Sequence, residues 1–515
     1  MTWKHYLGIT VLSMLVMIGI TSFQSAPGYM DAEYYFGMGL RIATNEGLSE
    51  PFMWNYLAGV ESIPRPGFSY WMPMPAFLSA LGIWISGLKT FAGGKIIHVL
   101  LAGLVPATAM IVTWRKTGNS SIATLAGLLA VFPVFYPVFL GTTDSFAVVM
   151  ILGGAFLLLT GEKGHPGKFL GLGVIAGLMH LSRADGLIWI LAGLYCAARA
   201  PKNRGISILS VIGGYLLCMA PWFGRNLIAT GQIMPTGLSG AFWLREYDDL
   251  FIYSPTGLTY QQWISQGLKA IFRTYLKAGI SNLNTALFVQ GQIMLAPFVF
   301  FGAWKHRRDI GFQAAFIAWL CIFLIMSFVF PFAGLRGGYF HSSAAFQTLI
   351  WCLAASGFYK VIDWGVEKRD WTRAKAGMVF GAVLVVMITV ASSYVFSSRV
   401  IGGDIKHPIW NESYHKTKRL AEYLENLGLE ENDLIMINNP PGFYIASGLP
   451  SIVIPSGGID DLLKAGEDFG ADYVVLEINH PQGLNDLYKY PEIDSRLTYL
   501  GSYHDAFIFQ LPEQD

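Results

Sequence analysis

Two carboxylates stand just after the first apolar segment of this chain, in the motif Asp31-Ala-Glu33-Tyr-Tyr. The segment before them begins near Tyr6 and is apolar enough for a membrane helix. Acidic residues beside a membrane helix are uncommon, and they usually serve chemistry, ion binding or a polar substrate. The pair therefore predicts an enzyme that acts on a polar substrate at the outer face of a membrane.

The composition places these residues in a membrane protein. Of the 515 residues, 53% are hydrophobic and 13% are charged. Soluble domains carry roughly 25% charged residues, about twice as many. The net charge is +1 and no basic patch is interleaved with aromatic residues, so we expect no nucleic-acid partner. The four cysteines lie inside apolar runs and are predicted to be buried small hydrophobic residues.

The apolar runs predict about eleven membrane crossings, since a spanning helix needs about 20 apolar residues. The runs begin near Tyr6, Ile96, Ile122, Asp144, Phe169, Ala184, Ile206, Ala286, Ile310, Phe340 and Lys375. Lys and Arg collect on the cytoplasmic side, which fixes the orientation. The basic clusters are Arg115-Lys116, Lys163 with Lys168, Arg199-Lys202-Arg204, Lys305 to Arg308, and Lys360 to Lys375. Together with Lys4 they predict a multi-pass plasma-membrane protein with a cytoplasmic amino terminus and an outer (periplasmic or extracellular) carboxyl terminus.

Two apolar segments differ from the other predicted crossings. The run Trp71–Phe91 is apolar, but counting it as a crossing would place Arg115-Lys116 outside. The prolines around its start suit a short, bent helix, so we predict a membrane-associated helix in the outer leaflet. The first helix resembles a signal peptide, but Pro27 would follow the cleavage site, which favours an uncleaved anchor.

The polar sequence gathers on the outer side and ends in a tail of different character. Helical spacing in Leu420–Leu427 alternates with strand-like runs that are separated by Gly and Pro. These strand-like runs are Asp433–Asn438, Asp472–Glu477 and Asp505–Leu511. We predict two domains: a membrane domain, residues 1–400 with a first outer loop at 24–70, and a small outer α/β domain, residues 401–515.

Several motifs along the chain together resemble the GT-C superfamily of polytopic glycosyltransferases, most of all its protein-mannosyltransferase and aminoarabinose-transferase branch. The motifs are Asp31-Ala-Glu-Tyr-Tyr, Ile63-Pro-Arg-Pro with Tyr70-Trp71, Leu181-Ser-Arg-Ala-Asp-Gly186, Ala220-Pro-Trp-Phe-Gly-Arg-Asn226 and Gly470-Ala-Asp-Tyr-Val-Val-Leu476. One residue separates the two acids of the first motif, where the family has an adjacent pair. The chain also lacks the Trp-Trp-Asp motif of oligosaccharyltransferases, which argues against N-glycan transfer.

The resemblance implies a GT-C-like fold and the transfer of a sugar from a polyprenyl-phosphate donor. The acceptor, which the sequence does not identify, would be a protein, a lipid or a glycan. An inverting displacement at the anomeric carbon needs one base, and Asp31 is the candidate. Asp31 could also be an N-cap of the helix Ala32–Ala43, and Glu33 could assist it or be a solvated first-turn acid.

Asp144 is the second candidate acid, because acidic residues recur at this place in the family. It could instead cap the next helix within Thr-Thr-Asp-Ser. If Asp31 and Asp144 converge, the two carboxylates would suit a divalent cation, and no other cofactor is expected.

The leaving phosphate requires cations, and the planar fork of arginine suits its oxygens. The resemblance places Arg65 at a phosphate-binding position, and Arg183, Arg225 and Arg336 are further candidates. Arg183 could instead pair with Asp185 in its own turn. His341 and Tyr70 are candidate substrate contacts, although a single histidine near a helix start is often structural.

Two other functions remain open from the sequence. A transporter or flippase would commonly show inverted repeats and ionisable residues at mid-helix, and neither pattern is convincing in this chain. A relative that binds lipid-linked sugars without catalysis would keep the fold and lose the base, whereas Asp31 is present.

Overall fold

The computed structural model describes residues 1–59, 62–160, 167–430 and 432–512. Within these residues, six helical segments are long and apolar enough to cross a membrane. They are α1 (Trp3–Thr21), α4 with α5 (Phe91–Thr117), α11 (Arg204–Thr230), α16 with η5 (Ile310–Val329), α18 through α19 (Gly338–Arg369), and α20 with η7 (Arg373–Ile401). The predicted integral membrane class is supported, and the number of crossings stays a prediction.

Five shorter apolar helices accompany these segments. They are α3 (Met74–Ser86), α6 (Ser120–Val131), α8 (Phe146–Thr160), α9 (Gly167–Ser182) and α10 with its preceding turn (Ala184–Ala198). Helix α3 lies within the Trp71–Phe91 run, where a short membrane-associated helix is predicted. Its 13 residues are fewer than a crossing needs, and it ends at Gly87, whose φ of 70° is left-handed.

The apolar run that begins near Ala286 is interrupted. Helix α14 (Leu268–Asn284) continues into the π-helical turn η4 (Thr285–Gln290), and α15 begins only at Ala296 and ends at His306. Between them, Gln292 and Ile293 have φ values of 46° and 58°. A positive φ is rare for a β-branched residue. The sequence does not predict this break in the helix, because apolar residues continue through it.

The chain divides into two compact units. Unit 1 contains residues 1–25, 72–224 and 274–410, and unit 2 contains residues 26–71, 225–273 and 411–515. The sequence assigns the first outer loop, residues 24–70, to the membrane domain. In the structure, residues 26–71 pack with the tail, because the loop supplies a strand to the sheet of the tail.

Unit 1 is a bundle of helices that pack closely at glycines. A Cβ atom at Gly302 would lie 1.9 Å from the Leu353 carbonyl oxygen, and one at Gly357 would lie 1.8 Å from that of Phe298. Small residues therefore allow α15 and α19 (Gln347–Arg369) to approach one another.

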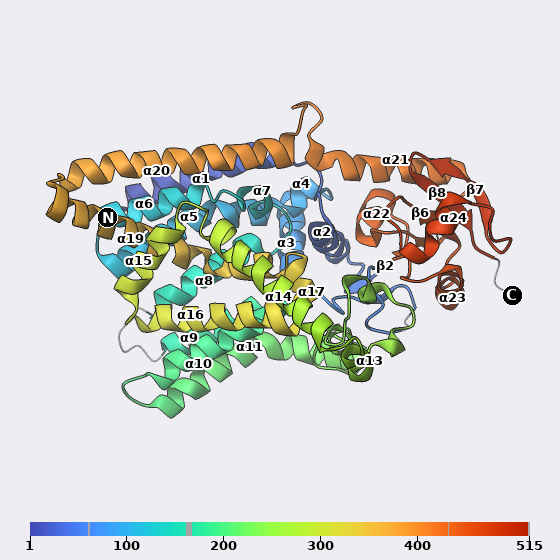
Figure 1. Cartoon of the computed structure of the whole chain (residues 1–515), viewed down its shortest axis with the longest axis horizontal. Coiled ribbons are helices and arrows are strands. Elements are labelled where there is room, and N and C mark those ends of the chain that lie inside the picture. The colour runs from blue at the N-terminus through green and yellow to red at the C-terminus, as the bar shows by residue number, and fades with distance from the viewer. Residues whose placement is uncertain (60–61, 161–166, 431, 513–515) are drawn as a thin grey trace. The chain divides into compact units, whose positions relative to one another are not determined.

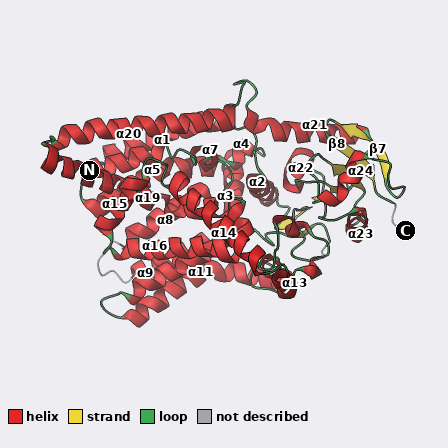
Figure 2. Cartoon of the chain, viewed as in Figure 1, coloured by secondary structure: helices red, strands yellow, loops and turns green. Residues whose placement is uncertain are grey.

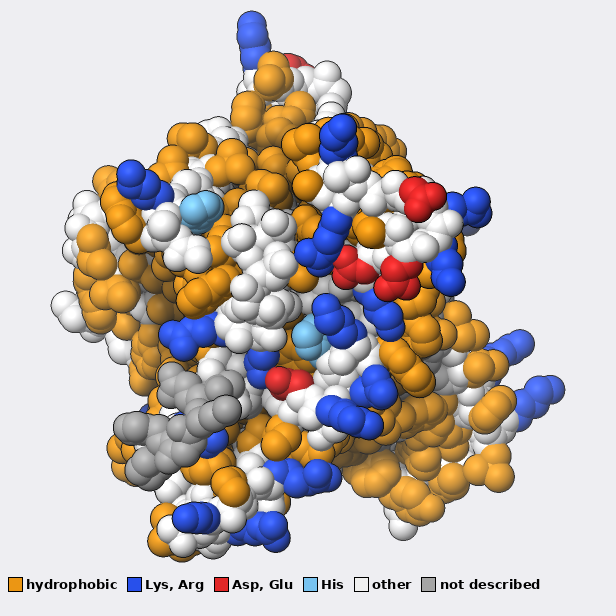
Figure 3. Space-filling model, turned by 90° about the vertical axis from the view of Figure 1, so that its left-hand side faces the viewer, with side chains coloured by type: hydrophobic (Ala, Val, Ile, Leu, Met, Phe, Trp, Pro, Cys, Tyr) orange, Lys and Arg blue, Asp and Glu red, His pale blue; other side chains and the backbone are white. Residues whose placement is uncertain are grey.

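Basic residues stand at several helix ends of unit 1. Helix α5 ends in Arg115 and Lys116, and the Lys116 ammonium lies 2.9 Å from the Asp309 carboxylate. Figure 3 shows many Lys and Arg side chains on one side of the molecule. The predicted basic residue Lys163 lies outside the described residues.

Unit 2 is built on a six-stranded sheet, and Figure 2 shows its long β7–β8 pair in the tail. The strand order is β2 (Phe52–Met53), β5 (Ser451–Ile452), β4 (Ile435–Met436), β6 (Tyr473–Leu476), β8 (Ala506–Gln510) and β7 (Thr498–Tyr503). The pairings from β2 to β6 are parallel and the two involving β8 are antiparallel. The tail helices are α21 (Glu412–Asn426), α22 (Pro440–Ser447), α23 (Ile459–Phe469) and α24 (Asn485–Lys489). The tail therefore contains both helices and strands, and the edge strand β2 comes from the loop, whereas the predicted domain division stays a prediction.

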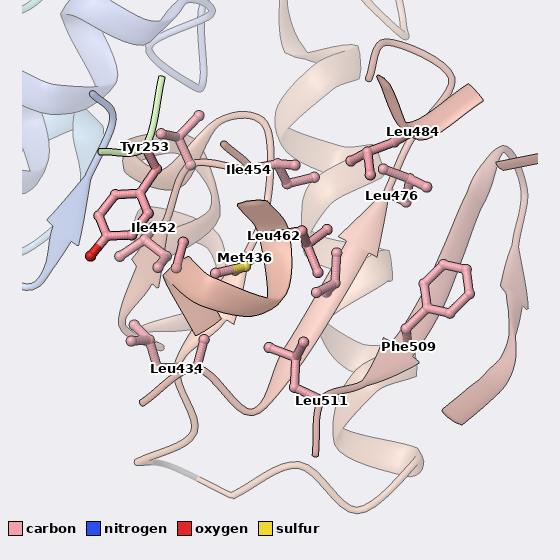
Figure 4. Close-up of a cluster of buried hydrophobic side chains, with 14 of the residues drawn as sticks. Tyr253, Leu434, Met436, Ile452, Ile454, Leu462, Leu476, Leu484, Phe509 and Leu511 are labelled. Carbon is pink, nitrogen blue, oxygen red and sulfur yellow. The ribbon is translucent and has the colours of Figure 1, made fainter. Parts of the chain in front are cut away.

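Neighbouring residues of β4 enter two different hydrophobic clusters, because successive side chains point to opposite faces of a sheet. Ile435 belongs to one cluster and Met436 to the other. Figure 4 shows the second cluster, in which Tyr253 packs with Met436 and Ile452 of the tail. The segment 225–273 therefore contributes to the core of unit 2.

The remaining short elements position loops. They include α2 (Met30–Ala43), the strand pair β1 (Ser49–Glu50) and β3 (Arg65–Pro66), α7 (Pro137–Leu140), α12 (Leu238–Ala241), α13 (Tyr260–Ser265), α17 (Pro331–Leu335) and α18 (Gly338–Ser343). In Figure 1, α2 lies beside α22 of the tail.

Candidate functional site

Asp31 lies in the first turn of α2. The helix begins at Met30 and its N-cap residue is Tyr29, so Asp31 is not the N-cap that the alternative interpretation requires. The side chain is half-buried. A carboxylate in a first turn is stabilised by the helix dipole, which favours its ionised form. Asp31 therefore lies at the start of a helix, where a negative charge is favoured.

Glu33 is buried, and its Oε2 accepts a hydrogen bond of 2.7 Å from Nδ2 of Asn439 in the tail. Burial raises the pKa of Glu33 to about 7, against the opposing effect of the Asn439 hydrogen bond and with a further rise from the negative charge of Asp31. Glu33 is thus not the solvated first-turn acid of the alternative interpretation. It links α2 to the tail.

Arg65 and Glu50 form a buried ion pair within unit 2. Nε of Arg65 donates to Oε1 of Glu50 over 2.6 Å, and each side chain is 1% exposed. Tyr34 donates to the other Glu50 oxygen over 2.6 Å. Among the described residues, Nη1 and Nη2 of Arg65 are buried without a hydrogen-bond partner. Buried donors normally have an acceptor, so this edge of the guanidinium suits an anion or ordered water.

Arg225 contacts the same loop of unit 2. Its Nη2 donates to the Leu48 carbonyl oxygen over 3.0 Å, and its Nη1 contacts Asn226. Leu48 lies directly before the strand that bears Glu50, so two of the candidate phosphate-binding arginines come together.

Tyr70 belongs to an aromatic group in the same loop. Its ring contacts Trp54 at a centroid distance of 4.9 Å, and Trp54 stacks on Trp71 at 4.5 Å. Aromatic faces of this kind suit the apolar side of a sugar ring as well as packing. The proposed substrate contact of Tyr70 stays a prediction.

In unit 1, Asp144 and His341 lie together. Asp144 precedes α8 and is fully buried, and its Oδ2 lies 3.3 Å from Nδ1 of His341 on α18. Oδ1 accepts a hydrogen bond from the Ser145 hydroxyl over 3.0 Å. The ring of His98 holds the turn, with its two nitrogens 3.1 Å from the Asp144 carbonyl oxygen and 3.2 Å from that of Pro75.

Arg183 reaches the same part of unit 1 through a second acid. Nη2 of Arg183 lies 3.1 Å from Oδ2 of Asp185, as the alternative interpretation of this turn expects. The same carboxylate accepts a hydrogen bond from the hydroxyl of Ser342, which is the neighbour of His341 on α18. Arg336, at the end of α17, is exposed.

The Asp144–His341 pair has the spacing of two ligands of one divalent ion. Zinc holds nitrogen and oxygen ligands at about 2.0–2.2 Å, which places tetrahedral ligands about 3.4 Å apart. The predicted cation site pairs Asp31 of unit 2 with Asp144 of unit 1. This site stays a prediction.

Sequence reasoning did not propose several polar residues near these candidates. Glu50, Asn439 and Ser342 are single polar residues in segments without a motif, and no local pattern singles them out. Gln290 is another: its Nε2 donates to the Ser343 carbonyl oxygen over 2.9 Å, and its Oε1 accepts from Tyr339 over 3.3 Å. It therefore holds two residues of α18.

No family model matches the chain, and no curated protein matches its sequence. Solved structures match over nearly its whole length. ArnT from Cupriavidus metallidurans bound to undecaprenyl phosphate has a TM-score of 0.56 at 12% identity, over 98% of this chain and 97% of that chain. The oligosaccharyltransferase AglB from Archaeoglobus fulgidus, in complex with an inhibitory peptide and a dolichol-phosphate, has a TM-score of 0.54 at 12% identity, over 92% and 69%. A complex of the Archaeoglobus fulgidus enzyme with Zn and sulfate has a TM-score of 0.55 at 14% identity, over 97% and 72%.

These matches establish the fold of the protein. Its fold is that of the GT-C membrane glycosyltransferases, which confirms the resemblance found in the sequence motifs. At these levels of identity the matches establish the fold, whereas the substrates and the catalytic residues rest on the chain itself.

Proposed function

We propose that this protein transfers a sugar from a polyprenyl-phosphate donor to an acceptor at the outer membrane face. The main support is the match to ArnT, which covers both chains almost completely and whose structure contains undecaprenyl phosphate. AglB, the second structural neighbour, is in complex with a dolichol-phosphate. Two neighbours with lipid phosphates favour a donor of the same chemical class here.

The basic residues of unit 2 support phosphate binding. Arg65 keeps one edge of its guanidinium on Glu50 and has two further buried donors without a hydrogen-bond partner among the described residues. A phosphate oxygen would satisfy both donors at once. Arg225 adds a second positive charge at the same loop. Together they would stabilise the charge that develops on the departing lipid phosphate.

Asp31 is the proposed base. It would take the proton of the acceptor nucleophile while the acceptor attacks the anomeric carbon and the bond to the lipid phosphate breaks. The configuration would invert, because no enzyme-bound sugar intermediate forms. The place of Asp31 in the first turn of α2 favours the ionised state that a base requires. Asp144 with His341 is the second acidic group, with a role either in catalysis or in holding a divalent cation.

The test is the comparison of wild-type protein with Asp31→Asn on a panel of radiolabelled polyprenyl-phosphate sugars. We expect transfer to fall by about 100-fold or more, the range for a lost general base, with binding of unlabelled polyprenyl phosphate retained. Asp486→Asn, an exposed change in the tail, serves as the matched control and should keep full activity.

Each result has a definite meaning. Full turnover by Asp31→Asn would remove Asp31 from the role of base and make Asp144 the next candidate. Lipid binding without turnover by the wild type on the whole panel would favour a carrier-binding or transport role instead. Loss of wild-type activity in a chelator, restored by one divalent ion, would add a metal to the reaction.

A further inference from the structure

One face of α2 is dedicated to contact with the tail. Glu33, Gly37 and Arg41 are spaced four residues apart, so they share one side of the helix. Glu33 bonds to Asn439, and Nη1 of Arg41 lies 3.1 Å from the Tyr444 hydroxyl. Between them, a Cβ atom at Gly37 would lie 3.3 Å from the Ile445 side chain, so the glycine lets α22 come close.

Asn439 connects two helices with a single side chain. Its Oδ1 accepts a hydrogen bond from the Gly442 N–H and so caps α22, and its Nδ2 donates to Glu33 over 2.7 Å. A Cβ atom at Gly442 would lie 2.9 Å from Oε2 of Glu33. The glycine therefore leaves the space that the carboxylate occupies.

The surroundings of α22 are fixed by the sheet. Strand β2, from the loop that follows α2, pairs in parallel with β5, and the Tyr56 hydroxyl donates to the Val453 carbonyl oxygen over 2.5 Å. The loop and the tail thus form one β-structure, on which α22 and α2 rest. Packed helices and strands hold side chains more precisely than free loops.

The helical geometry relates this contact to Asp31. Each residue of an α-helix rotates by about 100°, so Asp31 points about 160° away from Glu33. Holding the Glu33 face against α22 therefore sets the rotation of α2 and directs Asp31 away from the tail helix.

We propose that Asn439 is a positioning residue for Asp31, and that the Glu33 carboxylate serves as the link between them rather than as a chemical group. This inference rests on the proposed function only for the role of Asp31. A catalytic group displaced by about 1 Å can lose about 100-fold in rate, so a single hydrogen bond at the far side of α2 can matter.

The test uses a reversal of the hydrogen bond in the full-length protein. Asn439→Asp keeps the cap on α22 but replaces the amide donor by a carboxylate, so at a pH well above 7, where Glu33 is ionised, the two carboxylates repel and the link is lost. The double variant Glu33→Gln with Asn439→Asp restores it, because the new amide donates to the new carboxylate. Asn426→Asp, at the exposed end of α21, is the matched control.

Hydrogen–deuterium exchange and transfer kinetics test the proposal independently. Hydrogen–deuterium exchange should become faster in residues 30–43 of Asn439→Asp and return to the wild-type rate in the double variant. For transfer, we expect kcat of Asn439→Asp to fall by about 10- to 100-fold with KM for the donor nearly unchanged, and the double variant to recover most of it. The control should alter neither.

Exchange in α2 that is unaffected by Asn439→Asp would overturn the positioning role, whatever the activity of the protein. Recovery of exchange without recovery of transfer would assign the Glu33 carboxylate its own chemical role and overturn its assignment as a link. Failure of the wild type to transfer any sugar would refute the proposed function. The contact between Asn439 and Glu33 would then be tested by hydrogen–deuterium exchange alone.

Discussion

The Arg65–Glu50 pair brings two opposite charges into the interior of unit 2, where each is 1% exposed. Glu50 is held by Arg65, Tyr34 and the Ser69 hydroxyl, whereas Arg65 has one donor on Glu50 and two without a hydrogen-bond partner among the described residues. Such an ion pair contributes little to stability as a pair, but losing one partner leaves a buried charge. Glu50 thus fixes one edge of Arg65 and leaves the other edge for a ligand.

Removal of Glu50 should therefore destabilise the protein strongly. We expect Glu50→Ala to cost about 3–5 kcal/mol, seen as a lower Tm in detergent, because Arg65 keeps its charge in the interior. Asp363→Ala removes the partner of Arg373 in an ion pair whose side chains are 50% and 44% exposed, and it should cost about 0–1 kcal/mol. Equal Tm values for the two variants would contradict this account of Glu50.

At the scale of elements, the short helix α18 is held by two polar residues from other segments. Ser342 bonds to Asp185, and Gln290 contacts Tyr339 and Ser343. Gln290 precedes the break in the helix between η4 and α15, where Gln292 and Ile293 have positive φ. Strained backbone of this kind is often found next to functional sites. The break places a buried amide against the helix that carries His341.

Replacing this amide should disturb α18. Gln290→Leu leaves the Tyr339 hydroxyl and the Ser343 carbonyl oxygen without their partner, at an expected cost of about 1–3 kcal/mol each. We expect a lower Tm together with reduced sugar transfer, because His341 is no longer held beside Asp144. Gln313→Leu is the control: it loses hydrogen bonds with Tyr195 and Arg307. Loss of transfer in both variants alike would argue against a specific role for Gln290.

At the scale of the whole molecule, basic helix ends and the apolar helices predict the orientation in the membrane. Arg115 and Lys116 end α5, Lys305 and His306 end α15, and Lys368 and Arg369 end α19. Lys and Arg near the ends of membrane helices prefer the cytoplasmic side. The tail, including the sheet of unit 2, would then lie outside.

Chemical labelling tests this orientation. In a variant with the four native cysteines replaced by alanine, a cysteine at exposed Ser495 should react with a membrane-impermeant maleimide added to intact cells. A cysteine at Lys202, within a basic cluster, should react only after the cells are opened. Labelling of Lys202→Cys in intact cells would show that the predicted orientation is wrong.

Local patterns predict a large share of the elements. Alternating spacing in the tail places β4, β6 and β8 close to their observed bounds, whereas the helical spacing of Leu420–Leu427 covers only the second half of α21. The pattern failed at Gln290–Leu295, where apolar composition continues but the helix does not. It also missed β2, because two residues between turns have no periodicity to detect.

The sequence alone determined the membrane class, the GT-C resemblance and the two acidic motifs, since hydropathy and short motifs are properties of neighbouring residues. Only the tertiary structure decided which polar groups meet. Asn439 and Glu33 are 406 residues apart, and Arg65 meets Glu50 through the pairing of two short strands. Such contacts depend on how distant segments pack, and a buried polar side chain gives no sign in the sequence of the partner that will satisfy it.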